Sequence, residues 1–121
     1  MGTRDTTVQR RRALFQEALG LIEEHYARDL DLDWVARQVA TSRRQLQRAF
    51  AEIGQTSFRD QLAEVRMRHA VELLRQSDAP VRDVATSVGY RQPAQFAKAF
   101  RRHHGAPPSS VRRQSLGLTP A

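Results

Sequence analysis

The chain has 121 residues, which is long enough for one domain or for two very small domains that share a long element. Lys and Arg total 20 against 13 Asp and Glu, and the net charge of +7 is typical of a nucleic-acid-binding domain. The chain has no cysteine, which excludes disulfides, thiolate nucleophiles and thiolate-bound metals, and no apolar run approaches the ~20 residues of a membrane helix.

The two ends of the chain show no apolar periodicity. Residues 1–6 and 115–121 are small, polar and contain Gly or Pro, so we expect both to be disordered. No uninterrupted apolar stretch follows the N-terminal arginines, so the sequence predicts no secretory signal. We therefore expect a cytoplasmic protein that resides on the nucleoid.

Three helices are predicted in the first half of the chain. Apolar residues at spacings of three and four indicate a first helix over residues 7–26. Asp31 can cap a second helix over 32–39. The serine and glutamine of residues 42–45 have the form of a capping box, which predicts a third helix that ends near Gly54.

A long fourth helix follows, over residues 57–76, where the sequence contains neither Gly nor Pro. At ~1.5 Å per residue such a helix spans roughly 30 Å. Successive major-groove faces of B-DNA are ~34 Å apart. One rigid helix could therefore seat two DNA-reading units in neighbouring grooves.

Two more helices and a short last turn complete the chain. Pro80 begins a fifth helix that ends at Gly89, and Pro93 lies in the first turn of a sixth that ends near His104, before Gly105. No segment alternates apolar and polar residues over a strand's length, so no sheet is predicted.

The predicted fold is therefore all-α, with about seven helices. It consists of a first helix-turn-helix subdomain over residues 7–55, a linker helix over 56–77, and a second helix-turn-helix subdomain over 78–114.

The two subdomains are copies of one sequence unit. Val35-Ala36 is echoed by Val84-Ala85, an offset of 49 residues, and Phe50 is echoed by Phe100, an offset of 50. The second copy has therefore gained one residue, which falls between its two helices.

In a helix-turn-helix the first helix braces the second, whose N-terminal residues meet base edges in the major groove. Arginine pairs with guanine and glutamine with adenine, and each good bidentate pair contributes roughly 1 to 3 kcal/mol of discrimination. The predicted base-contacting residues are Arg43, Arg44, Gln47 and Arg48 in the first copy, and Arg91, Gln92, Gln95 and Lys98 in the second. The second set includes fewer arginines, so we expect it to set register and affinity more than specificity.

A basic helix end follows the second set of base-contacting residues. Arg101 and Arg102 precede two histidines there, which suits a phosphate contact and the dipole of the helix itself.

Three other functions are alternatives to sequence-specific DNA binding. A nonspecific architectural DNA-binding protein would need only Arg and Lys, whereas Gln47 and Gln92 are hydrogen-bonding readers. An enzyme would need a catalytic base, but His69 has only Glu72 nearby, an i,i+3 pair typical of a surface contact. We therefore predict no enzyme, and neither a metal nor another cofactor.

The third alternative is a protein-interaction module. Trp34, the only tryptophan, either marks a contact with another protein or packs against the first helix, and we favour packing.

One longer motif carries a family resemblance. It reads Val84-Ala85-x-x-Val88-Gly89-Tyr90-x-x-Pro93-x-x-Phe96-x-x-Ala99-Phe100-Arg101, followed by Gly105-Ala106-Pro107-Pro108 and Arg112. The chain over about residues 18–113 resembles the DNA-binding domain of the AraC/XylS family of bacterial transcription regulators. This resemblance implies two recognition helices in adjacent major-groove segments of double-stranded DNA, with phosphate contacts near helix starts at Ser42 and Ser57.

The resemblance also implies activation of transcription through contact with RNA polymerase. We expect binding as a monomer to an asymmetric site, without a membrane partner. Most family members carry a separate sensing domain, so the chain is either a single-domain regulator or a piece of a longer one.

The chain departs from the family pattern at several positions. Ala40 stands where the family often has a turn glycine, and it should strain the turn slightly. The other departures are Tyr90, Gln95, Lys98 and Val111.

Overall fold

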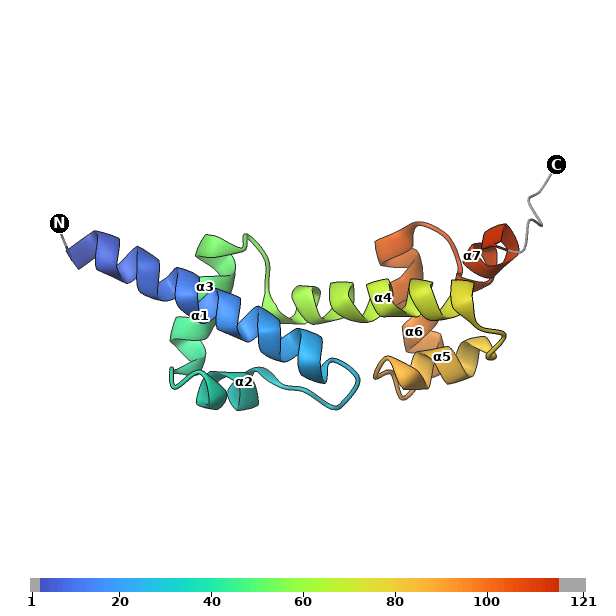
Figure 1. The fold of residues 1–121 in the computed structure, drawn as a ribbon, viewed down its shortest axis with the longest axis horizontal. Helices are drawn as coiled ribbons and strands as arrows, with labels where there is room; N and C mark the ends of the chain where they lie inside the picture. The colour runs from blue at the N-terminus through green and yellow to red at the C-terminus, as the bar shows by residue number, and fades with distance from the viewer. Residues whose placement is uncertain (1–2, 116–121) are drawn as a thin grey trace. The chain divides into compact units, whose positions relative to one another are not determined.

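The structure is a computed structural model that describes residues 3–115, and within this range every regular element is a helix (Figure 1). The seven helices are α1 (Thr3–His25), α2 (Leu32–Gln38), α3 (Arg43–Ile53), α4 (Phe58–Gln76), α5 (Val81–Ser87), α6 (Pro93–His104) and α7 (Pro108–Ser115). The predicted all-α fold with about seven helices is confirmed for this part of the chain.

The chain ends differ from the sequence expectation. α1 begins at Thr3, so the prediction that residues 3–6 are disordered is wrong. A polar stretch without Gly or Pro extends an existing helix easily, because each added residue gains a hydrogen bond without a new nucleation step. Ser115 is the last residue of α7, whereas residues 1–2 and 116–121 lie outside the described residues.

The chain divides into two compact units, Met1–Leu62 and Ala63–Ala121. The division falls inside α4, so the first turns of this helix belong to the first unit and the rest belongs to the second.

The first unit is built on the packing of α1 against α3, which Figure 1 shows as blue and green helices that cross. Phe15 of α1 and Phe50 of α3 meet edge to face, with their ring centroids 5.2 Å apart. Phe58, at the start of α4, also meets the Phe50 ring edge to face, at a centroid distance of 6.1 Å. Val35 and Ala36 of α2 are also buried in this core.

Side-chain caps start three helices of the first unit where the sequence predicts them. The Trp34 amide donates to Asp31 Oδ1 at 2.7 Å, and the Gln45 amide donates to Ser42 Oγ at 3.1 Å. The amide of Asp60 donates to Ser57 Oγ, also at 3.1 Å. Each cap satisfies one of the amides that a helix start leaves without a partner.

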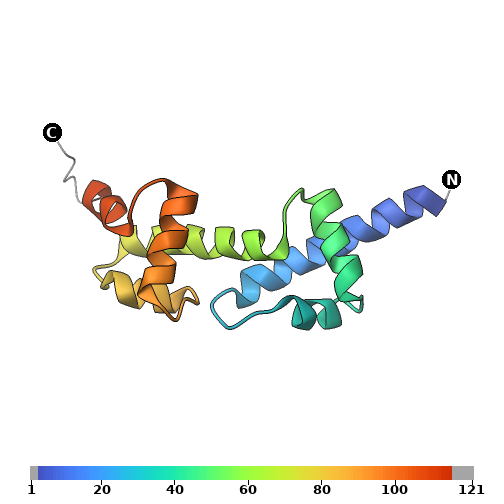
Figure 2. The ribbon, with the colours of Figure 1, turned by 180° about the vertical axis from the view of Figure 1, so that it is seen from behind.

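In the second unit α5 packs against α6 and α6 against α7, and Arg66 of α4 lies over the Tyr90 ring (Figure 2). Its core holds the fully buried rings of Phe96 and Phe100, whose centroids are 5.7 Å apart. α7 is longer than the expected short turn, because Val111 is fully buried and Arg112 Nε donates to the carbonyl oxygen of Leu74 at 3.3 Å.

The turns inside the two helix-turn-helix units repeat the same hydrogen bonds. The Thr41 amide donates to the Ala36 carbonyl, and the Tyr90 amide donates to the Ala85 carbonyl, both at 2.9 Å. The extra residue of the second copy is Arg91, which lies after this shared turn and before α6.

Each unit uses two left-handed backbone positions, and only the second unit fills them with glycine. Ala40 has φ 55° where its counterpart Gly89 has φ 103°. Gln55, just after α3, has φ 51° where its counterpart Gly105 has φ 82°. The expected strain at Ala40 is confirmed, because an L-residue with positive φ brings its Cβ close to the carbonyl oxygen.

Gly54 does not take the left-handed role at the end of α3. Its φ is −91°, but a Cβ on this residue would lie 2.4 Å from Cζ of Phe15. Glycine is required here because the aromatic ring of Phe15 packs directly against the backbone.

Candidate nucleic-acid interface

The outer face of α3 carries the predicted base-reading residues of the first unit. Leu46, Ala49 and Phe50 are buried, so the 3.6-residue period of the helix turns the other side to solvent. All four predicted residues on this helix, Arg43, Arg44, Gln47 and Arg48, are exposed.

These four residues differ in their partners. Within the described residues, no hydrogen bond or ion pair engages Arg44 or Gln47. Arg43 Nη1 lies 3.2 Å from Asp33 Oδ2 of α2, and Arg48 Nε lies 3.7 Å from Glu52 Oε1 on the next turn of α3. On this face, two predicted base-contacting side chains have no partner among the described residues, and two arginines each lie next to a carboxylate.

Glu52 has a second cationic partner. Its other carboxylate oxygen, Oε2, accepts a short hydrogen bond from Nη1 of Arg11 in α1. Sequence reasoning missed all three of Glu52, Asp33 and Arg11. The i,i+4 spacing of Arg48 and Glu52 was a visible signal. The Arg11–Glu52 pair joins residues 41 positions apart and had none.

The outer face of α6 has different chemistry. Gln95 and Lys98 are exposed, as predicted, and no described residue pairs with either. At the offset of 50 residues, Ala94 stands in the place of Arg44 and Ala97 in the place of Gln47. This face therefore has fewer hydrogen-bonding side chains than α3.

The start of α6 holds the other two predicted readers of the second unit. Gln92 is the N-cap residue by its backbone, although its side chain makes no capping hydrogen bond. Arg91 precedes it and is exposed, and it is engaged in an interaction within the chain.

The last turn of α6 is strongly basic. Arg101 and Arg102 are exposed there, and they stand at the positions that Ala51 and Glu52 occupy in α3. Cations at a helix C-terminus are favourable to the helix dipole, and they can also face a phosphate. The second unit therefore has positive charge where the first has an acid.

The two serines predicted to contact phosphates lie at the starts of α3 and α4. Ser42 Oγ and Ser57 Oγ each accept a backbone amide hydrogen bond, which leaves each exposed hydroxyl hydrogen available for donation. An anion at either helix start would meet a hydroxyl donor together with the positive end of the helix dipole.

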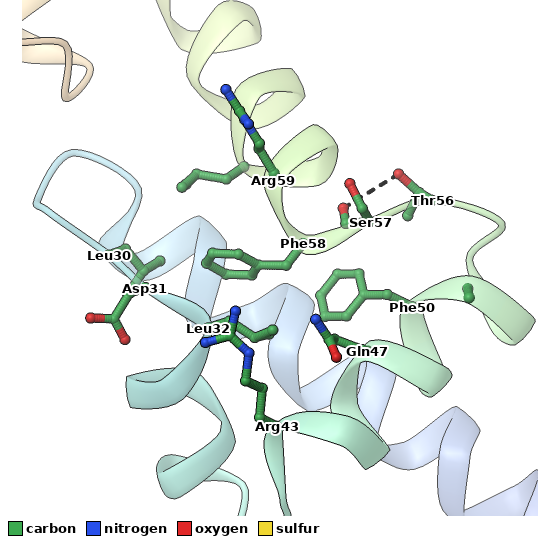
Figure 3. A pocket seen from close by; sticks show the side chains of 12 residues that line it. Leu30, Asp31, Leu32, Arg43, Gln47, Phe50, Thr56, Ser57, Phe58 and Arg59 are labelled. Carbon is green, nitrogen blue, oxygen red and sulfur yellow. Dashed lines mark hydrogen bonds between the residues drawn. The ribbon is translucent and has the colours of Figure 1, made fainter.

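A cavity of about 550 Å³ lies beside α3 in the first unit (Figure 3). Leu32, Phe50 and Phe58 form its apolar side, and Arg43 and Gln47 reach it from α3. One edge of the predicted base-reading face thus borders an apolar hollow.

Trp34 packs against the end of the first helix, as predicted. It is half-buried, and its ring lies edge to face with that of His25, the last residue of α1, at 5.1 Å. The guanidinium of Arg28 lies over the Trp34 ring, 4.0 Å from its centroid.

His69, the histidine considered as a catalytic base, is half-buried. His69 Nδ1 lies 4.0 Å from Glu72 Oε2, the predicted i,i+3 contact. Among the described residues, no group of three or more His, Asp or Glu side chains is arranged to hold a metal ion. Over the same range, none of the helices has both the length and the apolar character needed to cross a membrane.

The known proteins that the chain resembles are regulatory proteins. A family model described as a helix-turn-helix domain matches residues 35–114. The regulatory protein SoxS of Escherichia coli (strain K12) is 30% identical over 99 residues, which cover 82% of this chain and 92% of SoxS. The transcriptional regulator GlxA of Rhizobium meliloti (strain 1021) is 39% identical over 94 residues, or 78% of this chain.

The chain spans 29% of the length of GlxA and 40% of that of YijO, an uncharacterised transcriptional regulator of E. coli. These two relatives are therefore much longer than the part that matches.

Solved structures show the same fold. A transcriptional regulator from Chromobacterium violaceum, described as having an AraC-type DNA-binding domain, matches with a TM-score of 0.81 at 28% identity, over 85% of this chain and 92% of that one. The DNA-binding domain of the global transcriptional factor AdpA, solved in complex with a target DNA, matches with a TM-score of 0.79 at 28% identity, over 85% and 93%.

The paired helix-turn-helix units, the matched residues 35–114 and these relatives lead to one assignment. The chain belongs to the AraC/XylS family of helix-turn-helix transcription regulators and contains its DNA-binding domain.

Proposed function

We propose that the chain binds an asymmetric promoter site as a monomer, with α3 and α6 in successive major-groove segments, and that it activates transcription. The observation that carries this proposal is the divergence of the two outer faces on a repeated backbone. Arg44 and Gln47 of α3 are replaced by alanines in α6, although the turns before the two helices share their hydrogen bonds. Two identical readers would favour a direct repeat, whereas two different ones favour an asymmetric site.

In this proposal α3 supplies most of the base readout. Arg44 and Arg48 are four residues apart and share the outer face with Gln47, so one helix presents guanine-reading and adenine-reading groups together. Arg43 lies nearer the cavity and its Nη1 faces Asp33, so base contact by Arg43 would require exchange of that partner.

The second unit would act mainly on the DNA backbone. Gln92, Gln95 and Lys98 can still contact bases, while Arg101 and Arg102 suit phosphates. Thymine methyl groups can pack against the two alanines that replace the α3 readers.

Ser42 and Ser57 are the proposed phosphate contacts of the first unit. Both hydroxyls are exposed at helix starts, where the dipole attracts an anion.

Activation would proceed through RNA polymerase bound near the same promoter, with the protein located on the nucleoid in the cytoplasm. The family resemblance and the kinship with transcription regulators support this part of the proposal. Transcription in vitro from a promoter that carries the selected site, with purified polymerase, tests it directly. A reduced transcript level would show repression instead.

Selection of bound duplexes from a random library tests the binding mode. The expected result is one asymmetric sequence of about two DNA turns, bound by a monomer in analytical ultracentrifugation. A palindrome bound by two protomers would contradict the monomer. If random duplex competed as well as every selected sequence, the protein would be an architectural DNA-binding protein instead.

A further inference from the structure

Glu52 is the only acidic residue on α3, the helix whose outer face is proposed to read bases. An exposed carboxylate on such a face is unfavourable for DNA binding, because it repels the phosphate backbone. Its presence therefore calls for a function that outweighs this repulsion.

The contacts of Glu52 differ from those of an ordinary surface ion pair. Its Oε2 accepts a hydrogen bond from Arg11, whose side chain is only 19% exposed, while Glu52 itself is 47% exposed. The Nε atom of Arg11 is buried without a hydrogen-bond partner, so the carboxylate of Glu52 is the group that compensates this guanidinium in the described part of the chain. The largely buried Arg11 thereby holds the Glu52 carboxylate in place.

The free oxygen of the fixed carboxylate faces Arg48. Arg48 Nε lies 3.7 Å from Glu52 Oε1, and the side chain of Arg48 is 48% exposed. The contact uses the Nε edge, so both terminal nitrogen atoms of the guanidinium stay available for the two acceptors of a guanine. Glu52 can thus orient Arg48 without occupying the atoms that read the base.

The second unit offers an internal comparison. The counterpart of Arg48 is Lys98, and the counterpart of Glu52 is Arg102, which cannot brace a cation. Lys98 is not engaged by any described residue. The unit with the richer base-reading face is thus the one with the acid.

We propose that Glu52, held by Arg11, is a positioning residue that orients the Arg48 guanidinium for base recognition. This inference rests on the proposed base-reading role of Arg48. An arginine held near its bound rotamer loses less side-chain entropy on binding, which sharpens discrimination at the base it reads. The same carboxylate weakens binding to all DNA, so Glu52 favours specificity over affinity.

The test compares the wild type with Glu52→Gln, which keeps the size of the side chain and removes its charge. Selection with Arg48→Ala first identifies the base position that Arg48 reads, and selection with Arg44→Ala identifies the position of Arg44. Discrimination at both positions is then measured by titration, together with affinity for random duplex.

We expect Glu52→Gln to lose on the order of 2- to 10-fold in discrimination at the Arg48 position, the range that follows from freeing one arginine side chain. Discrimination at the Arg44 position should be unchanged, because Glu52 makes no contact with Arg44. Affinity for random duplex should rise, because a negative charge has been removed. A residue that only joins α1 to α3 would not give the selective loss at the Arg48 position, although removal of its charge would still tighten binding to random duplex.

A second variant guards against misfolding. Arg11→Gln combined with Glu52→Gln removes both charges, so no buried guanidinium remains without its acid, and the same selective loss is expected. Equal discrimination at the Arg48 position in wild type and both variants would overturn the inference. So would an equal loss at all positions in both variants.

Failure of the underlying function has a separate signature. If Arg48→Ala relaxed no base position, Arg48 would not read bases, and the role of Glu52 would be lost together with that part of the proposed function.

Discussion

Exchanging the residues at the two helix-turn-helix turns, Ala40→Gly and Gly89→Ala, should move stability in opposite directions. The two positions have the same turn hydrogen bonds, and both have a positive φ, 55° at Ala40 and 103° at Gly89. They differ in the size of the positive φ and in the residue that adopts it, since positive φ strains alanine but not glycine.

The magnitude follows from two opposing effects. A left-handed conformation costs an L-residue roughly 1 to 2 kcal/mol, which Ala40→Gly removes. The new glycine loses about 0.5 to 1 kcal/mol more backbone entropy on folding. Ala40→Gly should therefore raise the free energy of unfolding by about 0.5 to 1 kcal/mol.

Gly89→Ala should lower the free energy of unfolding, because it places an alanine at a positive φ. Its φ lies further from the left-handed region open to alanine, and its new Cβ would lie 2.9 Å from Nε of Arg66. The end of this arginine side chain can move, at the expense of its position over the Tyr90 ring. We expect a loss of about 1 to 2 kcal/mol in the free energy of unfolding.

Urea unfolding followed by circular dichroism measures both variants. With unchanged m values the urea midpoints report stability alone. In thermal unfolding of the same variants, a change of 1 kcal/mol corresponds to a shift of roughly 4 to 8 °C in melting temperature for a domain of 60 to 100 residues. A lower stability for Ala40→Gly would refute the reasoning, because it would mean that the turn does not hold alanine in a strained conformation.

Three further changes test other parts of the structure. Gly54→Ala should destabilise the first unit by about 1 to 3 kcal/mol in urea unfolding, since its Cβ would overlap the Phe15 ring; an unchanged midpoint would show that the ring can move aside. Asp31→Ala removes the carboxylate that accepts the Trp34 amide and should cost about 1 kcal/mol, with Asp31→Asn as the control that keeps an acceptor. Arg44→Ala should relax one base position and lose ~1 to 3 kcal/mol there in binding titrations, whereas a uniform loss across sequences would make Arg44 a phosphate contact.

The sequence by itself was sufficient for the helices, for the starts of α2, α3 and α4, and for the exposed side of α3. Asp31, Ser42 and Ser57 cap helices at the predicted positions, because a cap depends on residues only three apart. The exposed side of α3 follows from the spacing of its buried residues in the same way. The start of α1 was misplaced, since polar residues at a helix end carry no apolar pattern.

The role of Gly54 was also beyond the local pattern. By sequence it marks the end of the third helix, but the left-handed residue there is Gln55. The offset of 50 residues from Gly105 to Gln55 was present in the repeat, whereas the approach of Phe15 to the Gly54 backbone depends on how α1 packs on α3.

Only the tertiary structure decided which of the exposed arginines are free. Arg43, Arg44 and Arg48 look equivalent in the sequence, yet Asp33 engages the first, none of the described residues engages the second, and Glu52 engages the third. Helix starts and faces depend on neighbours a few residues away, which the sequence displays directly. The Arg11–Glu52 contact instead depends on burying the apolar faces of α1 and α3 against each other, which brings together residues that no local pattern relates.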